Sequence, residues 1–156
     1  MYKRILIAVD GSPLSNRGLE KGLELAAGLG AEVDILNVCE PWAVGMYDAM
    51  GWSAGYENTP QYLEDRRKQA MEILEPAAAA AAAAGVKANV MHVVDRYAAD
   101  GIIDAIASQN SDLVVLASHG RRGIRRALLG SQTAEVLARA TVPVLVITAR
   151  DSVADR

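Results

Sequence analysis

Residues 113–133 read LVVLASHGRRGIRRALLGSQT and run directly into a helix-like segment, TAEVLARA. The run LVVLA is nearly continuous in apolar residues, as expected for a strand covered on both faces. The glycines that follow would let backbone N–H groups turn towards an anion, and a helix N-terminus adds partial positive charge. This stretch therefore predicts a buried strand, a glycine loop and a helix in immediate succession.

Four other short apolar runs recur along the chain and alternate with helix-like segments. They are ILIAV (5–9), VDILNV (33–38), VMHVV (90–94) and VLVIT (144–148). Strands that alternate with helices form βαβ units with right-handed crossovers and a parallel sheet. At 156 residues the chain has the length of one domain. The sequence thus predicts a single α/β domain built on an open, five-stranded parallel sheet with helices on both faces.

The helix boundaries carry clear signals. Ser12-Pro13 and Thr59-Pro60 each combine a capping side chain with a proline suited to the first helical position. The first helix is predicted to end at Gly28 or Gly30, and the second at Gly85. Pro76 is expected to kink or interrupt the second helix. Two shorter helices follow, and their apolar residues are Ala99, Ile102, Ile103 and Ile106 in one and Val136, Leu137 and Ala140 in the other.

The connection 40–58, EPWAVGMYDAMGWSAGYEN, has no clear period and holds both tryptophans. A connection of this length in a small domain is typically functional or mobile. Three interpretations remain open: a flap that buries its own rings, a dimer contact and a ligand lid.

Composition excludes several classes of protein. The apolar share of 51% favours a globular chain, and the net charge of −3 gives no reason to expect a nucleic-acid or membrane partner. The single cysteine excludes an internal disulfide and fits a reducing compartment. The first apolar run is too short for a signal peptide, and no segment reaches the length of a membrane span. We therefore expect a cytoplasmic protein.

Two segments leave the carboxyl ends of predicted strands, where open parallel sheets bind ligands. One is the turn Val9-Asp10-Gly11-Ser12, and the other is the glycine loop after Ala117. The loop could cradle phosphates, contact nucleic acid or be a solvated connection, and neither GxxxxGK[ST] nor GxGxxG is present to decide. Its positive charge comes from Arg121, Arg122, Arg125 and Arg126.

Three single residues also invite a chemical interpretation. His119 could touch a phosphate or act as an acid or base, but no partner for catalysis is evident, so a positioning role is expected. His92 lies within a strand and is expected to be a hydrogen-bonded structural histidine. Cys39 is expected to be a small buried apolar residue.

Together these segments resemble the universal stress proteins over nearly the whole chain. That family opens with a strand ending in an Asp-containing turn, which IAVDGSPLS matches. It closes with glycine, two residues, glycine, nine residues, glycine and Ser or Thr, ahead of a helix and a PVLV strand. Here the pattern reads Ala117-Ser118-His119-Gly120, nine residues, Gly130-Ser131, then TVPVLVI. Alanine thus stands where the family has its first glycine.

The resemblance implies a Rossmann-like sheet of order 3-2-1-4-5, similar to adenine nucleotide alpha hydrolases, over residues 1–150, with a short polar tail at 151–156. It implies ATP as ligand, with any Mg²⁺ held mainly by phosphates and water. The loop after the fourth strand would hold ribose and phosphates, and the first turn and the end of the second strand would hold adenine. The candidate nucleotide-binding residues are Asp10, Gly11, Ser12, Val38, Ala117, Ser118, His119, Gly120, Arg121, Gly123, Gly130, Ser131, Gln132 and Thr133.

Three classes of function follow. The first, which we favour, is a nucleotide-binding regulatory protein of the stress response that changes conformation and contacts an unknown protein partner. The second is a slow ATPase or nucleotide-transfer enzyme, although DGSPLS differs from the SGGxDS loop of such enzymes and no catalytic residue can be assigned. The third is a dimeric interaction protein without nucleotide, favoured by Ala117, whose methyl group would lie near the ribose.

The last apolar run predicts an assembly. It begins after Pro143, a residue found at strand starts or on edge strands. In the order implied by the resemblance this strand is an edge, and an exposed apolar edge invites pairing with another chain. The polar tail offers little cover. We therefore predict a homodimer in which strand 144–148 faces its counterpart.

Overall fold

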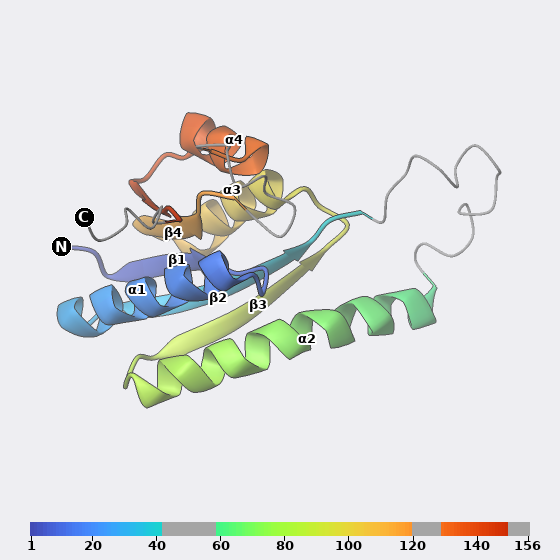
Figure 1. The fold of residues 1–156 in the computed structure, drawn as a ribbon, viewed down its shortest axis with the longest axis horizontal. Helices are drawn as coiled ribbons and strands as arrows, with labels where there is room; N and C mark the ends of the chain where they lie inside the picture. The colour runs from blue at the N-terminus through green and yellow to red at the C-terminus, as the bar shows by residue number, and fades with distance from the viewer. Residues whose placement is uncertain (42–58, 120–128, 150–156) are drawn as a thin grey trace, which may run out of the picture.

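The computed structural model describes residues 1–41, 59–119 and 129–149, and strands and helices alternate along them (Figure 1). Every strand expected from an apolar run is present, with bounds close to those predicted. The elements are β1 Arg4–Ala8, α1 Pro13–Leu29, β2 Glu32–Cys39, α2 Pro60–Ala83, β3 Ala88–Val94, α3 Ala98–Gln109, β4 Leu113–Ala117, α4 Ser131–Arg139 and β5 Val144–Ile147.

The five strands form one parallel sheet in the order β3-β2-β1-β4-β5. This confirms the predicted α/β fold and the strand order implied by the family resemblance. The chain first builds outward from β1 through β2 to β3, and then crosses back to place β4 on the other side of β1. The strand order therefore reverses between β1 and β4, and the region outside the carboxyl ends of these two strands is where such sheets bind ligands.

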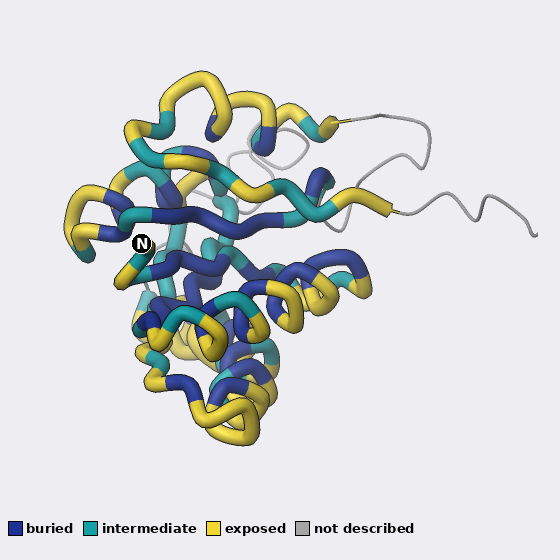
Figure 2. The backbone as a smooth tube through the Cα atoms, turned by 90° about the vertical axis from the view of Figure 1, so that its left-hand side faces the viewer, coloured by how far each residue is buried: buried dark blue, intermediate teal, exposed yellow. Residues whose placement is uncertain are grey.

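The helices form a layer on each face of the sheet. Helices α1 and α2 pack on one face and share a core with Ile5, Ile7 and Val115, whereas α3 and α4 pack on the other face with Leu6 and Val114 (Figure 1). The central strands are accordingly the most continuously buried part of the backbone trace (Figure 2). Burial on both faces explains why the apolar runs are continuous rather than alternating.

The capping signals act as predicted. Ser12 Oγ accepts a hydrogen bond from the N–H of Ser15 at 3.2 Å, and Thr59 Oγ1 accepts one from Tyr62 at 3.2 Å. Gly30 ends α1 in the left-handed conformation, at φ +67°. Of the two outcomes expected for Pro76, a kink or an interruption, the interruption is wrong, because α2 runs through this residue as one helix.

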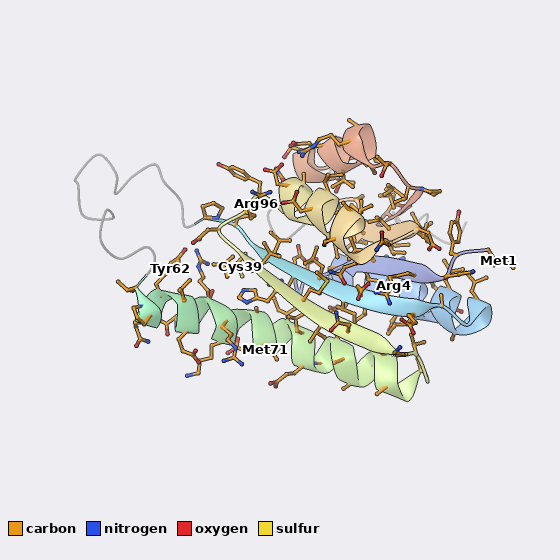
Figure 3. The ribbon with its side chains drawn as sticks, turned by 180° about the vertical axis from the view of Figure 1, so that it is seen from behind. Met1, Arg4, Cys39, Tyr62, Met71 and Arg96 are labelled. Atoms are coloured by element: carbon orange, nitrogen blue, oxygen red, sulfur yellow. The ribbon has the colours of Figure 1, made fainter. Side chains whose placement is uncertain are left out.

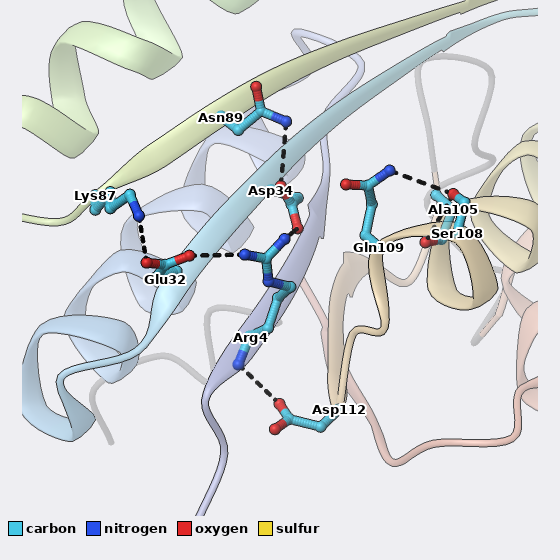
Figure 4. A network of polar contacts seen from close by, with 9 residues as sticks. All are labelled: Arg4, Glu32, Asp34, Lys87, Asn89, Ala105, Ser108, Gln109 and Asp112. Atoms are coloured by element: carbon cyan, nitrogen blue, oxygen red, sulfur yellow. Dashed lines mark hydrogen bonds and ion pairs between the residues drawn. The ribbon is translucent and has the colours of Figure 1, made fainter.

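A polar network ties the amino ends of β1, β2 and β3 together (Figure 4). Arg4 bonds Glu32 at 2.7 Å and lies 3.6 Å from the buried Asp34, which also accepts a bond from Asn89 at 3.3 Å. The hydrogen bond and charge of Lys87 are the main reason why the pKa of Glu32 lies below its usual value. This network lies at the end of the sheet opposite to the candidate site and joins three neighbouring strands.

Candidate functional site

The carboxyl ends of β1, β2 and β4 lie at the same end of the sheet. Figure 3 shows Cys39, the last residue of β2, at this carboxyl end, and Arg4 at the opposite, amino end. The turn after β1 and the residues after β4 both leave the sheet here, on either side of the reversal in strand order. The structure thus brings together the two segments that the sequence marked.

The turn after β1 is fixed by side-chain hydrogen bonds. Asp10 Oδ1 accepts a bond from the N–H of Ser12 at 2.9 Å, and the N–H of Asp10 donates to Ser15 Oγ at 3.0 Å. Gly11, between them, has φ +78°, a conformation that other residues adopt only with strain. A Cβ at Gly11 would also lie 3.1 Å from the Ile73 side chain. Both facts explain the glycine in DGS.

The start of α4 is docked on the end of β4. The N–H of Gly130 donates to the carbonyl of Ser118 at 2.7 Å, and Thr133 Oγ1 donates to the carbonyl of Ala117 at 3.0 Å. A Cβ at Gly130 would stand 3.3 Å from that Ser118 oxygen and 3.4 Å from His119 Cα, which is closer than most side chains tolerate. Gly130 therefore allows helix and strand to approach each other.

The N-terminus of α4 presents backbone donors without a side-chain cap. Gly130 is its N-cap residue and has no side chain to accept a bond from the first turn. The N–H groups of the first turn of a helix have no partner within the helix, and the helix dipole makes this end positive. The side chain of Gln132 is engaged elsewhere, because its Oε1 accepts a bond from the N–H of Ala99 at 2.8 Å. Any role of Gln132 towards a ligand is therefore left to its backbone, as the family resemblance implied.

The other predicted site residues lie around this centre. Val38 is half-buried at the end of β2, and its side chain packs over Gly101 of α3. His119 Nδ1 lies 3.1 Å from the hydroxyl of the buried Ser118. Gly120, Arg121 and Gly123, with the other arginines of the loop and the connection 42–58, lie outside the described residues.

Two expectations about single residues need correction. His92 is not satisfied by hydrogen bonds in the way predicted, because its Nε2 atom is buried without a hydrogen-bond partner among the described residues. Burial is the main reason why the pKa of His92 lies below its usual value, and the charge of Arg67 lowers it further. Cys39 is half-exposed rather than buried, and its Sγ donates to Asn37 Oδ1 at 3.4 Å.

Sequence reasoning overlooked two buried polar residues at the carboxyl end of the sheet. Ser15 is 2% exposed and Asn37 is 3% exposed, and both bond backbone groups of the turn after β1. Asn37 did carry a signal, since it is a polar residue within the apolar run VDILNV. A polar residue at a buried strand position requires a hydrogen-bond partner.

Two simple requirements, those of a metal-ligand cluster and of a membrane-spanning helix, are not met in the described part of the chain. No group of three or more His, Cys, Asp or Glu side chains is placed there to hold a metal ion. Among residues 1–41, 59–119 and 129–149, no helix has both the length and the apolar character needed to cross a bilayer.

Comparison with known sequences agrees with the fold. A model of the universal stress protein family matches residues 1–148. The chain is 29% identical over 152 residues to universal stress protein YxiE of Bacillus subtilis, covering 94% of this chain and 99% of that one. It is 31% identical over 153 residues to universal stress protein A homolog 2 of Coxiella burnetii, covering 97% and 98%.

Solved structures show the same architecture. The hypothetical protein MJ0577 superposes with a TM-score of 0.76 at 23% identity, covering 97% of this chain and 99% of that one. A universal stress protein in complex with cAMP gives a TM-score of 0.67 at 24% identity, covering 94% and 97%. A universal stress protein from Archaeoglobus fulgidus in complex with dAMP gives 0.67 at 22% identity, covering 94% and 98%.

Fold and site together define a doubly wound α/β protein whose candidate ligand site lies at the reversal of strand order. The match over residues 1–148 makes the assignment specific: the chain belongs to the universal stress protein family.

Proposed function

We propose that this protein binds an adenine nucleotide, with ATP as its physiological ligand, between the carboxyl ends of β1 and β4. The observation that carries the proposal is the pairing of a glycine-dependent turn after β1, at Asp10-Gly11, with the uncapped N-terminus of α4, which the Gly130–Ser118 hydrogen bond holds at the end of the neighbouring strand β4. Solved relatives in complex with cAMP and dAMP support the choice of an adenine nucleotide.

The proposed division of roles follows from the chemistry of each group. Backbone N–H groups at the start of α4, from Ser131 and Gln132, suit the negative phosphates. Asp10 and the backbone of Val38 lie at the ends of β1 and β2, where polar groups can read the edge of a base. Because the described residues offer no metal cluster, Mg²⁺ would be carried by the nucleotide's own phosphates and water.

We further propose a regulatory rather than a catalytic role, in the cytoplasm and in the response to stress. Asp10 Oδ1 accepts the N–H of Ser12, and His119 Nδ1 lies 3.1 Å from the Ser118 hydroxyl, so each of these two atoms already has a partner within the protein. Nucleotide binding would instead alter the surface offered to a protein partner. A slow ATPase is the second candidate, favoured only by the proximity of His119 to the proposed phosphate site.

Isothermal titration with ATP, ADP, AMP and GTP tests the proposal, with Gly130→Val as the disrupting variant. We expect adenine nucleotides to bind the wild type and the variant to bind at least about tenfold more weakly, since a side chain at Gly130 forces α4 away from Ser118. Gly28→Val is the matched control, because no atom lies within 4 Å of a Cβ added there. A folded Gly130→Val protein with wild-type affinity would show that the phosphates bind elsewhere.

A further inference from the structure

The peptide unit between Val9 and Asp10 is held at both of its polar ends by buried side chains. Its carbonyl, on Val9, accepts a hydrogen bond from Asn37 Nδ2 at 2.9 Å. Its N–H, on Asp10, donates to Ser15 Oγ at 3.0 Å. One partner comes from β2 and the other from the first turn of α1, so two elements fix the orientation of a single peptide plane.

The Val9–Asp10 peptide lies where the chain leaves strand β1. Strand β1 ends at Ala8, and the N–H of Val9 still bonds the carbonyl of Leu36 at 2.8 Å. The next carbonyl, on Val9, is taken by the Asn37 side chain. From that point the chain turns through Asp10 towards the start of α1. The orientation of the Val9–Asp10 peptide therefore sets the direction in which Asp10 leaves the sheet.

The side chains that hold the peptide are themselves held. Asn37 and Ser15 are 3% and 2% exposed, so water does not compete for their bonds. The Cys39 thiol donates to Asn37 Oδ1, which leaves the amide nitrogen of Asn37 directed at Val9. Ser15 is fixed through its own N–H, which donates to Ser12 Oγ. A buried polar group bonded in this way stays in one orientation.

We propose that Asn37 and Ser15 are positioning residues, which clamp the Val9–Asp10 peptide and so place Asp10 and the end of β2 for recognition of the adenine base. This inference rests on the proposed function and deepens it. Neither residue need touch the nucleotide. Asn37 is well suited to the task because it joins the ends of β1 and β2, the two strands that carry Asp10 and Val38.

The test uses Asn37→Leu and Ser15→Ala, with Ser111→Ala as the matched control. Ser111 is also a buried serine, at 4% exposed, but it lies before β4, at the amino end of the sheet. Its Oγ has no hydrogen-bond partner among the described residues. Two clamp variants are used, so that failure of one to fold leaves the other.

The first measurement needs no ligand. Amide hydrogen exchange at Asp10 should become about tenfold faster or more in both clamp variants and stay unchanged in Ser111→Ala, because the clamp protects this N–H. The amides of Leu6 and Val115, within the sheet, should keep their protection in all variants. Unchanged exchange at Asp10 would overturn the clamp.

The second measurement separates the base from the phosphates. Titrations with AMP and with inorganic tripolyphosphate should show AMP affinity reduced about tenfold in the clamp variants, with tripolyphosphate affinity unchanged. Wild-type AMP affinity in a variant with a freed Asp10 amide would overturn the positioning role. Failure of the wild type to bind either compound would reject the proposed function, and with it the base-positioning role, whereas the exchange measurement alone would still decide whether the clamp exists.

Discussion

Ala117 occupies the position of the first glycine in the family's loop pattern, at the end of β4. Its carbonyl accepts the hydroxyl of Thr133 at 3.0 Å, a contact that does not depend on its side chain. Strand alternation directs its methyl group to the same face as Val115, which packs on the side of α1 and α2. Because the methyl group points to the face covered by α1 and α2, we do not expect it to obstruct a ligand that is held by backbone atoms.

We predict that Ala117→Gly leaves ATP affinity within about twofold of the wild type and lowers the free energy of unfolding by about 0.5–1 kcal/mol, as expected for glycine in a strand. Titration calorimetry and urea denaturation measure the two quantities. A markedly tighter complex in the variant would mean that the methyl group does crowd the ribose.

The lowered pKa of His92 predicts that the stability of the folded protein depends on pH. Its pKa in the folded protein lies below the usual 6.5, so the unfolded chain takes up a proton at a higher pH than the folded protein does. The stability that depends on neutral His92 is thus complete above about pH 6.5 and decreases as the pH falls towards the folded-state pKa. Urea midpoints measured between pH 5 and 7.5 should show this decrease in the wild type and lose most of it in His92→Leu. Met91→Leu, next to it on β3, should behave as the wild type.

The candidate site was predictable where its signal is local. Asp10-Gly11-Ser12 and Gly130-Ser131 are short motifs whose backbone requirements can be read from neighbouring residues. Asn37 was missed because its partner, the carbonyl of Val9, lies 28 positions away in the sequence, whereas Ser15 was missed although its partner, the N–H of Asp10, is only five positions away. Only the folded register of β1 against β2 brings Asn37 to Val9.

Between elements, Gln132 links the two helices on one face of the sheet. The helix α3 begins after Tyr97, which makes no side-chain capping bond, and Gln132 of α4 supplies the missing acceptor to the N–H of Ala99. The residue that caps α3 is therefore 33 positions away in the sequence. This arrangement couples the start of α3 to the start of α4, where the phosphates are proposed to bind.

We predict that Gln132→Ala destabilises the protein by about 1 kcal/mol, the usual effect of losing a helix cap, while phosphate affinity falls less than about threefold. The reason is that the backbone N–H of residue 132 survives the substitution. Urea denaturation and titration with tripolyphosphate measure these effects. Glu135→Ala, one turn further along α4, serves as the control for general effects on this helix. Loss of phosphate binding without loss of stability would assign the side chain to the ligand instead.

The strands could be predicted from the sequence, whereas the continuity of helix α2 at Pro76 could not. Burial on both faces makes continuous apolar runs, so each strand is visible in the sequence. The continuity of α2 through Pro76 was not visible. Leu74 and Ala77 on either side of this proline are buried in the core, and Pro76 itself is exposed, so packing holds the helix while its lost hydrogen bond faces solvent.

At the scale of the whole molecule, the apolar runs predicted a parallel sheet but could not order its strands. The order arises from which crossover returns past β1, a long-range choice that no single segment encodes. It was supplied by the family resemblance, and the structure confirms it. The order leaves β3 and β5 as the two edges of the sheet.

The two edges differ in character. In β3 the exposed residues near its start are Asn89 and Val90, the latter 37% exposed, and the polar network of Lys87, Glu32 and Asp34 adjoins them. In β5 the second residue, Leu145, is 38% exposed, and its apolar neighbours on either side are half-buried. An apolar edge with few charges is the one that association would cover. We therefore propose β5 as the contact between two copies of the chain.

Leu145→Lys tests this assembly more cleanly than changes at Val144, because Val144 packs against the core shared with α3 and α4. We predict that the wild type is a dimer at micromolar concentration and that Leu145→Lys is a folded monomer, since two lysines would meet across the two-fold axis at the centre of the contact. Light scattering measures the mass and circular dichroism verifies the fold. Leu63→Lys, which is 43% exposed near the start of α2, is the control and should remain dimeric. A monomeric wild type, or a dimer that tolerates lysine at position 145, would show that the exposed edge of β5 is covered in some other way.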